Sequence, residues 1–168
     1  LFSGPSYLAA KEAQTILAEQ YNVAAELWSV TSYKRLREDA INVQRRNRLN
    51  PLGERLVPMV TSKLQGSEGP IIAVSDWMAG VVGQINRWTP RPMSVLGTDG
   101  FGRSDTREAL RSFFEVDAAH VVVTVLNSLA RDGEISREVV ADAITTFGID
   151  PNRPDPAHPD TGATGIGR

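Results

Sequence analysis

Short apolar runs alternate with amphipathic stretches along this chain, and the alternation predicts strands separated by helices. Between residues 9 and 18, apolar side chains recur three and four positions apart, which is typical of one buried helix face, and Asn22 is a plausible helix end. Three apolar runs bounded by polar or turn residues indicate short strands, at 25–30, 70–75 and 93–98. Leu1 reads as the end of a further strand that begins upstream. We therefore expect four strands.

The remaining amphipathic stretches predict helices at about 31–47, 53–64, 76–86, 105–115, 118–131 and 136–147. The valine-rich run at 121–126 is compatible with a strand, but its apolar positions continue at helical spacing, so we interpret it as helix. Asp105, with Glu108 three residues later, indicates a capping box at a helix start. Gly133 and Gly148 stand where helices commonly end.

Strands separated by helix-length segments pair in parallel through right-handed crossovers, with helices on both faces of the sheet. The expected fold class is therefore α/β, with three layers around a mostly parallel sheet. Ligands of such sheets bind at the carboxyl ends of the strands. Here that rim would be built from residues 3–6, 30–33, 75–77 and 97–104. We assign residues 1–150 to this domain, and residues 151–168, rich in Pro, Asp and Gly, to a flexible tail.

The loop after the last predicted strand has the order G-x-x-x-x-G-R-S from Gly97 to Ser104, which differs from a Walker A motif only by Arg103 in the lysine position. A nucleotide cradle is one interpretation. Asp99 inside the loop would repel phosphate, however, and a phosphate-binding loop normally follows the first strand. We favour a tight turn in which Asp99 and Arg103 fix the loop by pairing with each other or with a neighbouring domain, while Ser104 or Asp105 caps the next helix.

Composition narrows the possible partners. The 168 residues are 41% hydrophobic with a formal net charge of −2, which suits one domain and gives no electrostatic reason to expect nucleic acid or a membrane surface. No apolar run approaches the roughly 20 residues of a membrane span. The absence of cysteine excludes disulfides and thiolate chemistry and is compatible with the cytoplasm, the location that we expect.

Other candidate groups have simple interpretations. The basic excess between Lys34 and Arg48 is most often a solvated helix face; an interface with an acidic protein surface and nucleic-acid binding are the second and third alternatives. His120 and His158 have no partner by spacing and are expected at the surface. Aromatic residues in or beside the strand-end loops are expected to pack on neighbouring domains or a second subunit, namely Trp77, Trp88 and Phe101.

Four stretches carry a resemblance to a known family: WSVTSYKRLREDA, RRNRLNP, GPIIAVSDWM and LGTDGFGRSDTREALRSFFEVDAAHVVVTVL. Together they closely resemble the C-terminal domain of the homodimeric, bacterial-type pyruvate dehydrogenase, the decarboxylating first component of its complex. The similarity runs from Leu1 to about Asp150. Some of the loop residues are also similar to transketolases. The structural or interface candidates are Ser32, Tyr33, Asp76, Asp99, Phe101, Gly102, Arg103 and Ser104.

This resemblance implies an antiparallel edge strand upstream of Leu1 and a longer, homodimeric enzyme. Such enzymes decarboxylate pyruvate oxidatively with thiamine diphosphate and magnesium, and transfer the acetyl group to the lipoyl group of dihydrolipoyl acetyltransferase. Their catalytic, cofactor-binding and metal-binding residues lie in preceding domains, so none is assigned here. We expect this part to be mainly architectural and inactive alone. The alternative is a stand-alone small-ligand or anion-binding module that uses the loops around Ser3, Ser75, Asp99 and Arg103.

Overall fold

The centre of the fold is a parallel pair of strands, β1 (Ile71–Val74) and β2 (Met93–Leu96), in a computed structural model that describes residues 1–157. Two further extended segments lie beside β1. Phe2 forms a single parallel bridge with Val74 on one side and with Ser29 on the other. The spatial order is therefore Ser29, Phe2, β1 and β2. The prediction of four strands is not confirmed, because the segments at 1–3 and 25–30 contribute only isolated bridges.

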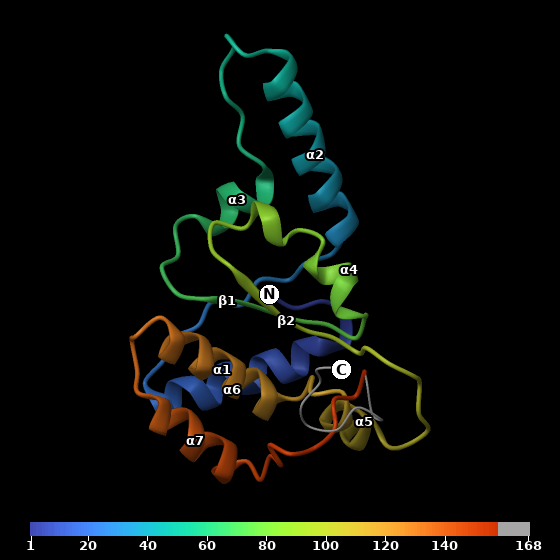
Figure 1. Cartoon of the computed structure of the whole chain (residues 1–168), viewed down its shortest axis with the longest axis vertical. Helices are drawn as coiled ribbons and strands as arrows, with labels where there is room; N and C mark the ends of the chain where they lie inside the picture. The colour runs from blue at the N-terminus through green and yellow to red at the C-terminus, as the bar shows by residue number, and fades with distance from the viewer. Residues whose placement is uncertain (158–168) are drawn as a thin grey trace, which may run out of the picture.

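The helices follow the predicted order, with changes in length (Figure 1). The described residues contain α1 (Tyr7–Tyr21), α2 (Tyr33–Leu49), α3 (Met59–Leu64), α4 (Ala79–Gly83), α5 (Arg107–Phe113), α6 (Ala118–Arg131) and α7 (Arg137–Thr146), with 3₁₀ turns at Gly4–Ser6 and Asn86–Trp88. The valine-rich run is helical, as predicted. The left-handed conformation of Asn22 (φ 54°), Gly133 (φ 83°) and Gly148 (φ 63°) confirms the three predicted helix ends.

Two predicted helices are shorter than expected for local reasons. The helix predicted at 53–64 begins only after Pro58, because Asn47 holds the preceding segment extended: its side chain donates to the Leu56 carbonyl at 2.9 Å and accepts from the Leu56 N–H at 3.0 Å. The helix predicted at 76–86 ends early, because the Asn86 side chain bonds both the N–H and the carbonyl of Met93 and draws the chain into β2.

Side chains of β1 alternate between two apolar clusters, which places helices on both of its sides. Val74 packs with α1, α6 and α7, whereas Ile71 and Ala73 pack with α2, α3 and α4 (Figure 1). In the first cluster, Val122 and Leu126 of α6 are fully buried, and the small side chains of α1 allow that helix to approach closely. This packing explains why the sequence of α6 is almost as apolar as a membrane span.

The stretch Arg107–Arg131 has the length and hydropathy of a membrane-crossing helix. It is nevertheless two helices, because a turn with φ 58° at Glu115 separates α5 from α6. The apolar face of α6 is directed at α1 and α7, which is the arrangement of a core helix.

Asp117 caps α6 and binds His120. Its carboxylate accepts a hydrogen bond from the His120 N–H at 2.9 Å and lies 2.7 Å from His120 Nδ1. The expectation of a surface histidine is wrong for His120, whose side chain is only 13% exposed, because the cap turns it inward. His158 lies outside the described residues. Partial burial raises the pKa of Asp117, whereas the hydrogen bonds from His120 and the charges of His120 and Arg153 lower it. The lowering effects together are larger, so the pKa lies below its usual range.

We predict that Asp117→Ala lowers the free energy of unfolding at pH 7 by about 1 kcal/mol, the usual contribution of a helix cap. Because the native pKa of Asp117 lies below its unfolded value of about 3.9, its stabilising effect is complete well above that pH and fades as the pH falls through the native pKa. Urea titrations at pH 7 and pH 3 should therefore show a smaller difference from wild type at pH 3.

Asp142→Ala is the matched control for this prediction, because Asp142 is exposed on α7 and its side chain forms no hydrogen bond with the described residues. It should change the free energy of unfolding little at either pH. An equal loss for Asp117→Ala at both pH values would show that the ionised carboxylate is not the source of the stability.

Candidate functional site

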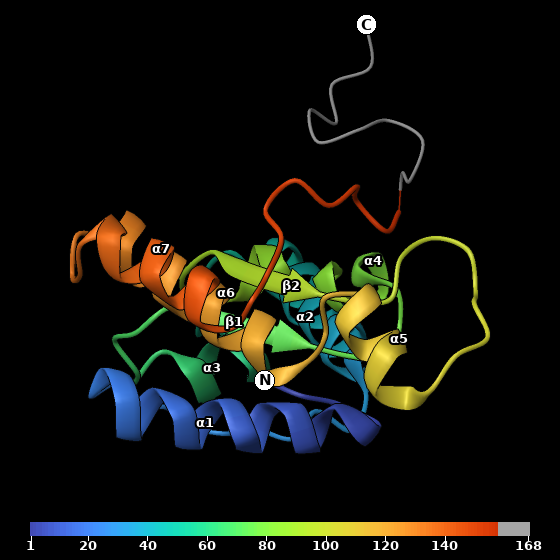
Figure 2. The ribbon, with the colours of Figure 1, turned by 90° about the horizontal axis from the view of Figure 1, so that it is seen from below.

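The loops that follow the strands meet at one edge, toward which both strand arrows point in Figure 2. Ser3 and Ser75 join the loop before α1 to the loop after β1, with their hydroxyl oxygens 2.7 Å apart. The Ser75 hydroxyl also accepts from the Trp77 N–H at 3.1 Å, and Ser75 is fully buried. From here the two loops diverge to α1 and α4 on opposite sides of β1, which makes this edge a topological switch point.

The loop after β2 is fastened to the loop after β1 by three polar contacts. The Thr98 N–H donates to the Trp77 carbonyl at 3.0 Å, and its hydroxyl donates to the Asp76 carbonyl at 2.8 Å. The Asp99 carboxylate accepts from the Ala79 N–H, with oxygens at 3.1 and 3.3 Å. Asp99 therefore fixes this loop through the backbone at the start of α4, and not through the predicted pairing with Arg103.

Gly97 permits this close contact. A Cβ atom built at Gly97 would lie 2.5 Å from the nitrogen of Ala79 and 2.6 Å from the carbonyl oxygen of Trp77. Both are backbone atoms, so no side-chain movement can relieve the overlap. Gly102, by contrast, has open space around its Cβ position and no positive φ. Gly100 is the glycine of this loop with a positive φ, at 102°.

The second half of the loop does not form a phosphate cradle. Arg103 lies over the ring of Phe113, 4.2 Å from its centre, and forms no ion pair with Asp99 among the described residues. The helix that follows is only seven residues long. Its cap is Thr106, whose hydroxyl accepts from the Ala109 N–H at 3.2 Å. The predicted caps Ser104 and Asp105 are therefore wrong.

The Asp105–Glu108 capping box fails for a local reason. The Asp105 carboxylate accepts from the N–H of the next residue, Thr106, at 2.7 Å, so it is held one position before the cap.

A pocket of about 310 Å³ lies under this loop, between the start of α1 and α5. Polar and charged side chains from four segments line it: Ser6, Asp76, Thr98, Arg103 and Arg111. Of the predicted candidates, Asp76, Gly102 and Arg103 share this pocket. Two arginines face a single carboxylate there, so the pocket carries a modest positive charge.

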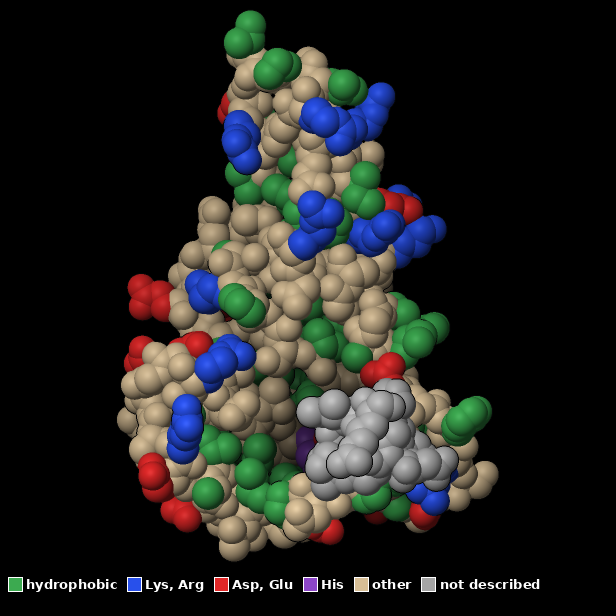
Figure 3. Space-filling model, in the orientation of Figure 1, with side chains coloured by type: hydrophobic (Ala, Val, Ile, Leu, Met, Phe, Trp, Pro, Cys, Tyr) green, Lys and Arg blue, Asp and Glu red, His purple; other side chains and the backbone are tan. Residues whose placement is uncertain are grey.

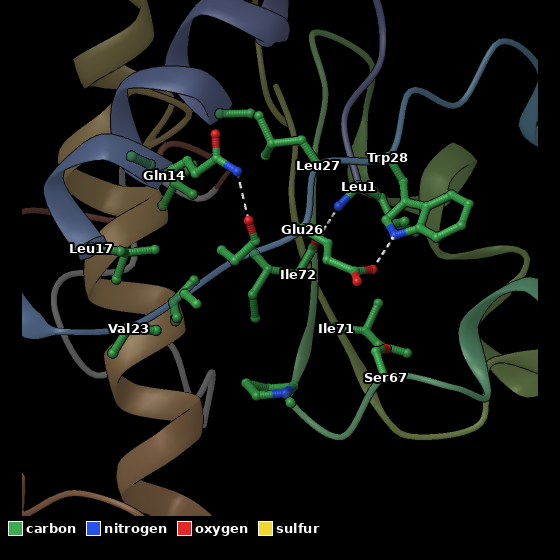
Figure 4. Close-up of a pocket in the computed structure, with 18 of the residues that line it drawn as sticks. Leu1, Gln14, Leu17, Val23, Glu26, Leu27, Trp28, Ser67, Ile71 and Ile72 are labelled. Atoms are coloured by element: carbon green, nitrogen blue, oxygen red, sulfur yellow. Dashed lines mark hydrogen bonds between the residues drawn. The ribbon is translucent and has the colours of Figure 1, made fainter.

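A larger cavity of about 550 Å³ lies beside β1 and the segment that precedes it, facing residues 23–28 (Figure 4). Its walls are mostly apolar, and its polar groups bond one another: Gln14 Nε2 donates to the Ala25 carbonyl at 2.6 Å, and Trp28 Nε1 donates to Glu26 at 3.1 Å. The lining also contains Glu68 and the amino group of Leu1, which donates to the Ile72 carbonyl, but most of the contact that the cavity offers is apolar.

Ser32 and Tyr33 lie apart from the polar groups of both pockets, at the start of α2. The Ser32 hydroxyl accepts from the Arg35 N–H at 3.2 Å and caps the helix. Tyr33 is buried in the second apolar cluster, where burial raises its pKa to about 12 and its hydroxyl has no partner in the described part of the chain. No hydrogen bond within residues 1–157 joins either residue to Asp76, Asp99 or Arg103.

Apolar side chains are exposed at the switch-point edge, beside α4 and on the loop (Figure 3). Trp77 is 63% exposed, Met78 56% and Phe101 89%. We call these three residues the rim patch. Trp88 was expected to join it but is buried, because the 3₁₀ turn at Asn86–Trp88 directs its ring into the second cluster. The rim patch and the charged pocket share the loop after β2.

The model of the transketolase-like TK C-terminal domain family matches residues 2–117, more than half of the chain. The chain belongs to this family. The transketolase-like domain is also 44% identical to the pyruvate dehydrogenase E1 component of Pseudomonas aeruginosa over 157 residues, 93% of this chain and 18% of the relative. It is 46% identical to that of Mycolicibacterium smegmatis over 150 residues (89% and 16%) and 43% identical to that of Escherichia coli K12 over 157 residues (93% and 18%).

These comparisons confirm the resemblance, and the transketolase-like domain spans less than a fifth of the length of these relatives. Within residues 1–157, no group of three His, Asp or Glu side chains could hold a metal ion. The geometry therefore offers contact surfaces and a small charged pocket.

We predict that Gly97→Ala lowers the free energy of unfolding by about 2–3 kcal/mol, because the added methyl group must separate the loops after β1 and β2. Gly102→Ala in the same loop is the matched control and should change stability by less than about 0.5 kcal/mol, since nothing lies near its Cβ position. Chemical denaturation of both variants measures the difference. Equal stability of the two would contradict the close contact at Gly97.

Proposed function

We propose that this transketolase-like domain is the C-terminal domain of a homodimeric pyruvate dehydrogenase decarboxylating component. The main support for this proposal is the 43–46% identity of the chain to three pyruvate dehydrogenase E1 components, over about nine tenths of its length. The complete cytoplasmic enzyme would decarboxylate pyruvate oxidatively with thiamine diphosphate and magnesium. It would pass the acetyl group to the lipoyl group of dihydrolipoyl acetyltransferase.

The described residues do not fit the cofactor. They offer no three-carboxylate or histidine cluster for magnesium, and the arginine of the loop stacks on Phe113. Asp99, four residues before this arginine, is already engaged by the start of α4. We therefore derive no catalytic step from this domain and assign it an architectural role.

The rim patch supports that role because two of its three side chains lie between anchored backbone positions. Trp77 and Met78 lie between two anchored positions, the Trp77 carbonyl bonded to Thr98 and the Ala79 N–H bonded to Asp99. An interface that orders no loop on binding loses less entropy, and buried tryptophan side chains contribute strongly to such interfaces. We infer that the rim patch packs on a neighbouring domain or on the second subunit. In the longer chain, the segments at 1–3 and 25–30 would be completed as strands beside an antiparallel edge strand.

A second candidate function is a small-anion site, which the pocket containing Arg103 and Arg111 favours. Arginine pairs bind phosphate or carboxylate groups bidentately. Asp76 on the opposite wall weakens the attraction, so the architectural role remains our main proposal.

We predict that the full-length protein releases CO₂ from pyruvate when thiamine diphosphate and magnesium are supplied, whereas residues 1–168 alone do not. Decarboxylation measured with a ferricyanide acceptor tests both statements. Turnover by the isolated domain would overturn the architectural assignment, and a full-length protein inactive on pyruvate would overturn the proposed enzyme.

We predict that Trp77→Ser combined with Phe101→Ser weakens the dimer of the full-length protein at least tenfold, because two exposed aromatic anchors are lost. Sedimentation equilibrium measures the dissociation constant. Trp28→Ser is the control, since Trp28 is partly exposed on the outer segment of the sheet, on the far side of Phe2 from β1 and β2. A double variant with wild-type affinity would place the rim patch outside the dimer interface.

A further inference from the structure

The distal half of α2 and the chain that returns from it project from the body of the molecule (Figure 1). We call residues 41–58 the arm. The two buried side chains of α2, Tyr33 and Ala40, lie in its first half, and no residue of the arm is buried. Packing thus contributes little to this segment, although tertiary packing is what usually stabilises a helix.

Polar contacts hold the arm together. Asn47 bonds the backbone of Leu56 in both directions, and Asp39 accepts from the Met59 N–H at 2.8 Å where the returning chain reaches α3. The arm is therefore a built element whose long sides remain available for contact.

The charge of the arm is opposite to that of the rest of the chain. It carries four arginines and one glutamate, which is a formal charge of +3. Because the whole chain has a net charge of −2, the residues outside the arm have a net charge of −5. Closer to the body, Lys34 and Arg35 lie 3.6 and 3.7 Å from Glu38. The four arginines of the arm form no ion pair with the described residues. They are Arg45, Arg46, Arg48 and Arg55. Blue side chains mark this region in Figure 3.

The tip of the arm adds apolar surface. Leu49 is 56% exposed and Leu52 is fully exposed. Arginine and large apolar side chains that lie together are typical of protein interfaces. The arginines could also bind the phosphates of a nucleic acid, but a nucleic acid would offer Leu52 no apolar partner.

An acidic surface lies at the opposite end of the molecule, where α6 turns into α7 (Figure 1). Between residues 131 and 142 there are two arginines and four exposed carboxylates, Asp132, Glu134, Glu138 and Asp142. Arg131 pairs with Asp132 at 3.3 Å, which leaves the other carboxylates in excess. The arm and this acidic end are too far apart on one molecule to meet, because they occupy opposite ends.

We propose that the arm docks on the acidic α6–α7 end of a second copy of this chain. Two copies placed antiparallel bring each arm to the acidic end of the other, so the contact forms twice and closes on itself, as two-fold symmetric interfaces do. Arginine can engage the carboxylates bidentately while Leu52 covers apolar surface between them. The inference rests on the proposed function only for the existence of a dimer.

The test compares two charge-matched triple variants of the full-length protein by sedimentation equilibrium at 50 and 500 mM NaCl. The arm variant is Arg45→Gln with Arg46→Gln and Arg48→Gln. The control removes three positive charges from the first half of the same helix, with Lys34→Gln, Arg35→Gln and Arg37→Gln. We expect the arm variant to weaken the dimer at least tenfold at 50 mM NaCl and the control to change it less than threefold. The effect should shrink at 500 mM, because salt screens exposed charges.

A reciprocal variant identifies the acidic partner surface. Glu134→Gln with Glu138→Gln and Asp142→Asn should weaken the dimer as much as the arm variant does, and combining both sets should add little, because they remove the same contact. Additive losses, equal losses in arm variant and control, or an unchanged dimer would each overturn the proposal. So would a monomeric wild-type protein.

Two further measurements keep the outcome clear. Leu52→Ser should weaken the dimer at both salt concentrations, and its fully exposed position leaves folding intact if the triple variant unfolds. Anisotropy of a labelled 20-base-pair DNA tests the alternative; DNA binding lost in the arm variant with an unchanged dimer would overturn the protein contact. Pyruvate decarboxylation by the same samples reports on the proposed enzyme separately, since dimer affinity is measured without substrate.

Discussion

The close backbone contact at Gly97 is the constraint on which the functional edge depends. Where β1 and β2 end, their loops must separate toward α4 and α5, yet the Thr98 N–H still reaches the Trp77 carbonyl at 3.0 Å. Only a residue without Cβ allows that approach. Asp99 then reaches the start of α4, and Trp77 and Met78 are left outside the contact. The attachment of the two loops to each other and the exposure of Trp77 and Met78 thus occur at the same contact.

The two apolar clusters give this edge a firm base. Because successive side chains of β1 point to opposite faces, Val74 enters one cluster and Ala73 the other, and a displacement of β1 would disturb both. The hydroxyl pair of Ser3 and Ser75 lies directly above, at the end of the same strand. The position of the rim is therefore set by the same burial that stabilises the fold.

Sequence periodicity predicted the helices well where packing and local signals agree, as in α1, which ends at left-handed Asn22, and α6, whose apolar face is continuous. It predicted the loop less well. Asp99 and Arg103 are four residues apart and oppositely charged, which suggested that they pair. Asp99 instead binds the backbone of Ala79, 20 residues earlier in the chain, and Arg103 lies over the ring of Phe113. Neither partner carries a charge, so the pattern of charges along the sequence does not indicate it. His120 and Trp88 were misplaced for a related reason, because a cap or a 3₁₀ turn directs a side chain inward without altering hydrophobic spacing.

The rim patch and the arm bind their partners through different physical forces. The apolar rim patch gains from leaving water and is insensitive to salt, whereas the arm acts through arginines whose attraction depends on ionic strength. A domain that presents two such surfaces can fix the distance and the orientation between two neighbours at once. The pyruvate chemistry proposed for the longer enzyme would need its domains to be held in a fixed relation. In the proposed enzyme, this domain would supply such a relation through its surfaces.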